Sequence, residues 1–334
     1  MGLGSGIDNG EADKEGETML PPLIQQRVGP GSRVLIAGAG GGYDFVCGLP
    51  LFFALEAVGC QAFLANFSST PLNDMAEAVK HTETLWEVTA DSSRPSYFPE
   101  GWLARWFREW RGRDLSLWCF GASGVGPYHQ SYQYLVDRLE IDMIIIIDGG
   151  VDSLLRGDEY SLASPLEDAL TLAAVSLLDG PQKFLAATAF SAERLDNISH
   201  AQVLARIADL TRAEALLGVT SLLPFTEEGR LFVEAAEYVL AHQAGMHQSV
   251  VIGSMLSALR GEFGDQVVNP YTQNTPPWVS PLMCLYWFFD LSEVARQNIY
   301  LSRLLPTKIF PEAVERLHEF MKTRPKRGWE SIPI

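Results

Sequence analysis

Short apolar runs alternate with longer amphipathic stretches along most of the chain. Six strands are predicted by the runs at 33–38, 61–67, 115–120, 141–147, 184–190 and 282–289. Helices are predicted at 44–58, 73–81, 101–110, 127–138, 165–178, 199–208, 211–217, 227–242, 246–260, 292–304 and 311–321. The unbroken run from Ile144 to Ile147 is typical of a central parallel strand that is covered on both faces. The alternation predicts an α/β fold with a doubly wound, mainly parallel, Rossmann-like sheet.

Changes in this pattern divide the chain into four segments. Residues 1–20 are rich in glycine and acidic residues, which predicts a disordered acidic tail. Residues 21–191 form the expected Rossmann-like core. Every element expected in 192–262 is a helix, including 211–217, so this segment is interpreted as a helical insertion or lid. Residues 263–334 supply a last strand and helices that complete the core.

A glycine-rich turn after the first strand is the main candidate for a ligand site. Gly38, Gly40, Gly41 and Gly42 follow the strand, and Asp44 stands where the next helix begins. At such a turn, backbone N–H groups and a helix N-terminus can face a ligand. In a doubly wound sheet, ligands bind beyond the carboxyl ends of the strands, so other strand ends should contribute to the same site.

The other candidate ligand-binding residues lie in turns and loops that follow predicted strands or precede the last one. They are Asn66, Ser123, Gly149, Gly150, Arg156, Asn269 and Tyr271. The last two belong to a loop at 267–277 that is too rich in proline and asparagine for regular structure. We expect this loop to close over the ligand.

The acidic residues indicate the chemistry. Asp44, Asp148 and Asp152 are the candidate catalytic residues, because carboxylates at one sheet edge suit hydroxyls, an amine or Mg²⁺. Asp148, Asp152 and Glu159 are the candidate metal ligands. A bare phosphate would be repelled there unless a cation lay between. The alternative is structural: Asp44 caps a helix, and Asp148 and Asp152 are turn residues.

Two familiar enzyme motifs are matched only in part. Gly38 and Gly40 match the first two glycines of a dinucleotide fingerprint, but Tyr43 occupies the third position, and Asn66 stands near the end of the second strand, where an acid is expected. An NAD(P)-dependent oxidoreductase is therefore the less favoured alternative. Ser123 lies in a strand–turn–helix segment like a nucleophile elbow, but Val125 replaces the required glycine, and no histidine is tied to this serine.

Composition narrows the class of function further. The chain has 41 Asp and Glu residues against 25 Lys and Arg, a formal net charge of −16. This balance argues against nucleic acid and anionic membranes as partners, because both are bound through Lys and Arg. Four widely separated cysteines without zinc spacing predict buried reduced thiols. With no secretory signal and no apolar run of about 18 residues, we expect a soluble cytoplasmic protein, with a homo-oligomer left open.

Several segments together resemble the domain of unknown function 1152 family. They are Gly38–Asp44 with Leu49-Pro50, Asp148–Asp152 with Arg156–Glu159, Asn269–Tyr271, and Ser280-Pro281 leading to Tyr286–Asp290. The resemblance spans about residues 30–322. It implies a cytosolic, Rossmann-like α/β protein and attaches no reaction.

The sequence thus predicts an enzyme of unknown reaction that binds a small polar metabolite, nucleotide- or sugar-like, at the glycine-rich and aspartate-rich loops. A divalent cation such as Mg²⁺ is part of this hypothesis. A non-catalytic ligand-binding or assembly protein that uses the same cleft remains an alternative.

Overall fold

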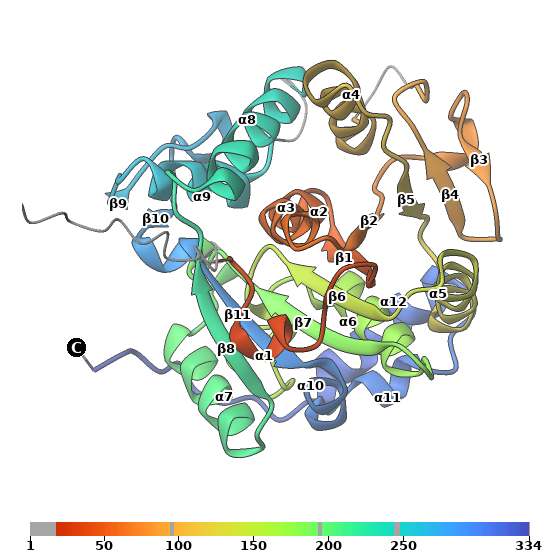
Figure 1. Cartoon of the computed structure of the whole chain (residues 1–334). Helices are drawn as coiled ribbons and strands as arrows, with labels where there is room; N and C mark the ends of the chain where they lie inside the picture. The colour runs from red at the N-terminus through yellow and green to blue at the C-terminus, as the bar shows by residue number, and fades with distance from the viewer. Residues whose placement is uncertain (1–17, 94–96, 193–195, 244–247, 334) are drawn as a thin grey trace, which may run out of the picture.

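Most of the predicted apolar runs form one large sheet in the computed structural model, which describes residues 18–93, 97–192, 196–243 and 248–333 (Figure 1). Within the described residues the strands are β1 (Arg33–Gly41), β2 (Gln61–Phe67), β3 (Val79–Lys80), β4 (Leu85–Val88), β5 (Leu117–Phe120), β6 (Met143–Asp148), β7 (Gln182–Ala187), β8 (Leu216–Ser221), β9 (Gly264–Asp265), β10 (Trp278–Val279) and β11 (Leu285–Asp290). The first 17 residues of the expected acidic tail lie outside the described residues.

The sheet has the order β3-β4-β5-β2-β1-β6-β7-β11-β8. Its central strands β5, β2, β1, β6 and β7 are parallel, and antiparallel strands flank them on both sides. The chain starts in the middle at β1, winds outward through β2 to β5, and then returns to β6 on the other side of β1. The expected α/β, doubly wound fold is confirmed, and its winding reverses between β1 and β6.

Helices cover both faces of this sheet. Their bounds are α1 (Pro22–Gln25), α2 (Asp44–Cys47), α3 (Leu49–Ala57), α4 (Pro99–Arg111), α5 (Val125–Leu139), α6 (Pro165–Ser176), α7 (His200–Arg212), α8 (Glu227–His242), α9 (Val250–Leu259), α10 (Leu291–Gln297), α11 (Leu301–Leu304) and α12 (Phe310–Thr323). The helices α3, α4, α8 and α9 share one hydrophobic core, and α5, α6, α7, α10, α11 and α12 share the other. The two groups lie on opposite sides of the sheet (Figure 1).

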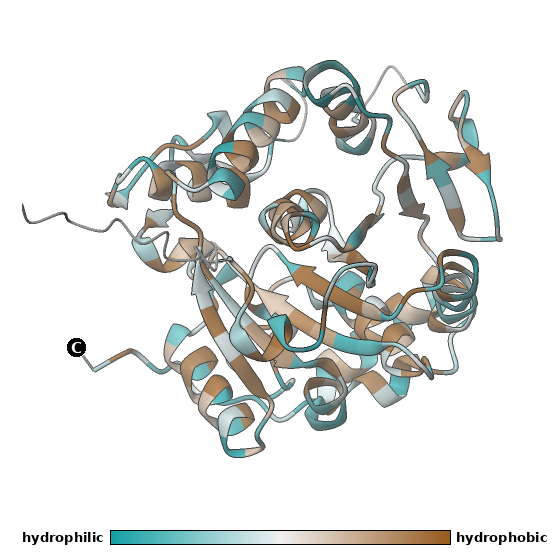
Figure 2. Cartoon of the chain, in the orientation of Figure 1, coloured by the Kyte–Doolittle hydropathy of each residue, from teal (hydrophilic) through white to brown (hydrophobic). Residues whose placement is uncertain are grey.

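The central strands serve both cores because their side chains alternate between the faces. Ile145 and Ile147 of β6 belong to the core under α3, whereas Ile144 and Ile146 belong to the core under α6. The central strands are accordingly hydrophobic along much of their length (Figure 2). This double burial explains the continuous apolar run that the sequence shows at β6.

The segment 192–262 is not entirely helical, which corrects one expectation. Where a helix was expected at 211–217, the structure has β8, which pairs antiparallel with β11 at the edge of the main sheet. The helix predicted at 73–81 is likewise replaced by a short 3₁₀ turn and the hairpin strand β3. Both errors occur at sheet edges, where strands are short and less hydrophobic and their periodicity is weak.

The helix predicted at 44–58 is divided into α2 and α3 at Gly48. A Cβ at Gly48 would lie 2.6 Å from Ile36 Cγ2 and 3.2 Å from Ile147 Cγ2, so glycine lets this helix pair approach β1 and β6 closely. That approach sets the position of Asp44 at the start of α2.

All four cysteines are buried and free, as predicted. Among the described residues, no helix combines the length and the hydropathy that crossing a bilayer demands.

Candidate functional site

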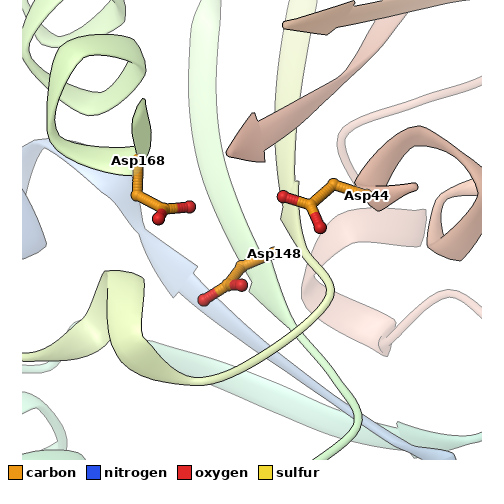
Figure 3. A group of neighbouring side chains, drawn as sticks. All are labelled: Asp44, Asp148 and Asp168. Carbon is orange, nitrogen blue, oxygen red and sulfur yellow. The ribbon is translucent and has the colours of Figure 1, made fainter. Parts of the chain in front are cut away.

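Three carboxylates converge beyond the ends of β1 and β6, at the point where the winding reverses. Asp44 is the first residue of α2, Asp148 is the last residue of β6, and Asp168 lies in the first turn of α6. One oxygen from each carboxylate lies within 4.8 Å of the others, and the Asp44 and Asp168 side chains face each other with Asp148 below them (Figure 3). Asp148 and Asp168 are buried, and Asp44 is partly buried.

Asp44 is held in place by the two glycine-rich turns. Its Oδ2 accepts a hydrogen bond from the Gly40 N–H at 2.8 Å, and its Oδ1 accepts one from the Gly149 N–H at 3.3 Å. The N-cap of α2 is Tyr43, so Asp44 does not act as a simple helix cap. The Gly40 N–H, expected to face a ligand, is instead used to orient this carboxylate.

The glycines beside these acids make room for them. A Cβ on Gly40 would lie 3.0 Å from Asp168 Oδ1 and 3.2 Å from Asp44 Oδ2, and a Cβ on Gly149 would lie 2.8 Å from Asp44 Oδ1. Gly40 therefore lies against two of the three carboxylates. A larger residue at either position would crowd them, which gives a physical reason for glycine there.

The carboxylates of Asp44, Asp148 and Asp168, which we call the triad, line a cavity of about 200 Å³ that contains further acids. Asp148 Oδ2 accepts a hydrogen bond from the Ser153 N–H at 3.1 Å, which fixes that side chain. The other acidic residues that line the cavity are Asp152, Glu167 and Asp196. No Lys, Arg or His is among the described residues that line it. Six acids therefore line this cavity, and the described part of its wall offers no cationic side chain to compensate their charge.

Burial and mutual repulsion hold protons on these acids. Burial, with the charge of Asp152, raises the pKa of Asp44 to about 7 against the opposing hydrogen bonds from Gly40 and Gly149. Burial and the charge of Asp44 raise the pKa of Asp148 to about 7. The pKa of Asp168 is raised well above its usual range by burial and by the charges of the neighbouring aspartates. A bound cation would remove this cost by attracting every carboxylate in the group.

The structure brings together only part of the predicted site. Asp44, Asp148 and Asp152 line the acidic cavity with Gly40, Gly41 and Gly149. Gly42, with φ +79°, lines a neighbouring cavity of about 240 Å³ beside Tyr43 and Tyr97. Gly38 lies inside β1, paired with Ile147, and Gly150 is buried without lining the acidic cavity.

Glu159 and Arg156 have a different role. The Glu159 carboxylate accepts hydrogen bonds from the backbone N–H groups of Arg156 and Gly157, at 2.9 and 2.8 Å, and lies near the Arg327 guanidinium. Arg156 is exposed. Neither residue lines the acidic cavity, so the expected metal ligand Glu159 instead stabilises a turn.

The remaining candidates also lie outside the acidic cavity. Asn66 donates hydrogen bonds from Nδ2 to Gly42 O at 3.2 Å and to buried Glu100 Oε1 at 2.9 Å, so it supports the glycine turn from behind. Asn269 caps the short 3₁₀ helix that contains Tyr271. Ser123 lines a separate, larger cavity.

Sequence reasoning missed three acids that line the cavity: Glu167, Asp168 and Asp196. The segment Ser164-Pro-Leu-Glu167 resembles a capping box, which assigns Glu167 a local role at the start of a helix. The Ser164 side chain makes no capping hydrogen bond, and Glu167 and Asp168 both line the cavity instead. One signal could have indicated Glu167 and Asp168. They form an adjacent pair of acids in the first turn of a predicted helix, and that helix follows a strand with a glycine-rich end.

The comparison with protein families assigns the chain. The family described as "Protein of unknown function (DUF1152)" matches residues 35–324. The chain belongs to the DUF1152 family. No curated protein and no solved structure matches the chain significantly. The matched region of this DUF1152 chain contains the whole carboxylate triad, whereas the family description attaches no activity to it.

Proposed function

We propose that the chain is a cytoplasmic, divalent-cation-dependent enzyme that acts on a small polar metabolite. In this proposal Asp44, Asp148 and Asp168 hold the cation. The observation that carries the proposal is the convergence of these carboxylates within 4.8 Å, at the switch point of the sheet, in a cavity with no cationic side chain among its described lining residues.

The donor set favours a hard cation. Carboxylate oxygens are the preferred ligands of Mg²⁺, Mn²⁺ and Ca²⁺, whereas softer metals favour thiolate or imidazole. A bound cation of this kind supplies Lewis-acid polarisation of a substrate oxygen or of water. Asp152 and Glu167 line the same cavity outside the triad, where they can hold substrate hydroxyls or exchange a proton.

The same geometry makes a dinucleotide the weaker hypothesis. A pyrophosphate at the glycine turn would face the Asp44 carboxylate, and the Gly40 N–H that should bind it already donates to that carboxylate. Asn66, near the end of β2, donates hydrogen bonds from its amide to Gly42 O and Glu100 Oε1, so that amide is not directed to a ribose. Both features support a cation at this turn over an NAD(P) phosphate.

Isothermal titration of the EDTA-treated chain with Mg²⁺, Mn²⁺ and Ca²⁺ tests the proposal. We expect saturable binding of at least one cation, and at least a tenfold loss of affinity in Asp148→Asn, which keeps an oxygen to accept from Ser153. The control is Asp179→Asn, which removes one exposed charge from a residue that does not line the cavity. Binding that is absent, or unchanged in Asp148→Asn, would contradict the proposal.

Mass spectrometry of compounds that co-purify with the chain, with and without EDTA, addresses the metabolite. We expect a polar metabolite whose retention depends on the cation. Retention of a nicotinamide cofactor would instead support the oxidoreductase. Bound metabolite that is never turned over would favour a non-catalytic ligand-binding role.

A further inference from the structure

A second, larger cavity lies beside the acidic one. It measures about 570 Å³ and is lined by residues after β2 and β5 and at the start of α12. Glu167 lines both cavities. Gly41 of the acidic cavity lies against the wall of the larger one, because its Cβ would be 3.3 Å from Ser69 Oγ and 3.4 Å from Phe67 Cδ1. The two cavities therefore adjoin along Gly41 and Glu167.

Hydroxyl side chains, with the exposed Asn73 amide, give the larger cavity its polar character, and two of the hydroxyls have already donated their hydrogen. Thr70 Oγ1 donates to Tyr97 O at 2.8 Å, and Ser123 Oγ donates to Lys308 O at 3.2 Å. What each hydroxyl has left to offer is an oxygen lone pair. At these two positions the wall can accept hydrogen bonds from a ligand but has no hydrogen left to donate.

The charges of this wall have one sign. Glu83 and Glu167 are its charged side chains among the described residues, and no Lys, Arg or His lines it. A phosphate or carboxylate in this cavity would find acceptors and negative charge in place of the Arg or Lys that such groups need. Ligand groups that donate hydrogen bonds, namely hydroxyls and amines, fit this wall.

Aromatic residues supply the apolar part of the lining. Trp86 and Phe67 are mostly buried in the wall, and the Phe67 ring packs against Phe310 with centroids 6.4 Å apart. A ligand of mixed polarity can place its C–H groups against these rings and its hydroxyls against the serines and threonines. The volume falls within the range of about 300–1,000 Å³ that small-molecule sites occupy.

We propose that this cavity binds the hydroxyl-rich ring of an uncharged or cationic sugar-like metabolite and excludes its phosphorylated counterpart. The inference deepens the proposed function, on which it rests for one point: the reacting end of the metabolite extends past Glu167 toward the cation at the triad. Recognition of the ring itself requires no cation.

Saturation-transfer NMR with a charge-matched series tests the inference. The probes are glucosamine, glucose and glucose 6-phosphate, which share a pyranose ring and differ in charge. We expect saturation transfer to glucosamine and glucose, and a signal at least fivefold weaker for glucose 6-phosphate. The blocking variant is Ala122→Trp, which adds a large side chain at an exposed position of the cavity wall and should abolish the transfer. Its matched control is Gln130→Trp on the exposed side of α5.

The outcomes separate this inference from the proposed function. Three results would overturn the inference. They are saturation transfer that is strongest for glucose 6-phosphate, transfer that is absent for all three probes, and transfer that is unchanged in Ala122→Trp. Cation binding, measured by titration in the same Ala122→Trp variant, should remain within twofold of the unaltered chain. Sugar binding without cation binding would leave the inference standing and refute the cation site, and the reverse result would refute only the inference.

Discussion

Replacing Asp168 by asparagine should stabilise the cation-free chain and abolish its stabilisation by cations. The substitution removes a buried carboxyl whose charged form burial and the neighbouring aspartates disfavour, and among the described residues the Asp168 carboxyl makes no hydrogen bond. Two full charges no more than 4.8 Å apart repel each other by at least about 3.5 kcal/mol at an effective dielectric constant of about 20. Because partial protonation already relieves part of this repulsion, we expect a net gain of about 1–2 kcal/mol.

This gain is measurable as a rise in melting temperature. An unfolding entropy of about 2.1 cal/mol/K per residue, taken over 334 residues, converts each ~1 kcal/mol into about 1.4 °C. Asp168→Asn should therefore melt about 1–3 °C above the unaltered chain in EDTA at pH 8. The gain should shrink at pH 5.5, where more of the carboxyls hold protons in both chains.

Adding cation should reverse the order of the two chains. A ligand at a hundred times its dissociation constant stabilises the folded state by about 2.7 kcal/mol, or about 4 °C in this chain. The unaltered chain should show this rise, and Asp168→Asn should lose most of it. Differential scanning calorimetry with EDTA and with Mg²⁺ measures both effects, and Asp179→Asn serves as the control for charge alone. If Asp168→Asn melts lower in EDTA and keeps the full cation response, the assigned role of this cluster is wrong.

Three further predictions concern the same carboxylates. Cation affinity should fall at least tenfold between pH 8 and pH 6, because protons compete with the cation for Asp44 and Asp148, whose pKa values are about 7. Titration calorimetry at both pH values measures the affinity, and equal affinities would argue against these ligands. The same raised pKa values mean that the cation-free fold binds more protons than the unfolded chain, so its free energy of unfolding should fall as pH rises from about 4 to about 7, as urea titrations would show. Gly40→Ala should weaken cation binding at least tenfold, because the new Cβ would crowd Asp168 and Asp44. The control Gly29→Ala, with open space around its Cβ, should leave the cation affinity unchanged. Equal cation affinities in the two variants would contradict this geometry.

The central part of the fold could be predicted because its signals are local. The apolar run of β6 records burial on both faces, and Asp148 follows at the end of that strand. Once parallel strands are inferred, their carboxyl ends must share one edge of the sheet. That rule alone places Asp44 and Asp148 near each other.

The remainder depended on contacts between distant segments. The strand β8 has no fully buried residue and pairs with β11, more than 60 residues further along the chain, so its own residues carry little indication of a strand. Glu159 was a candidate metal ligand together with Asp152, yet its turn directs it to the N–H groups of Arg156 and Gly157. Asp168 could be placed only once the path of α6 was known.

The demands of the fold account for two of the three carboxylates but not for the third. Asp44 accepts the Gly40 and Gly149 N–H groups, and Asp148 accepts the Ser153 N–H, so each satisfies backbone donors. Among the described residues, no backbone N–H donates a hydrogen bond to the Asp168 carboxyl, and burial with its position beside Asp44 and Asp148 raises the pKa of that carboxyl. A buried acid that repels its neighbours and accepts no backbone hydrogen bond destabilises the fold unless a cation binds the three carboxylates together. Asp168 is therefore the residue that most directly distinguishes a cation site from a pair of acids that support turns.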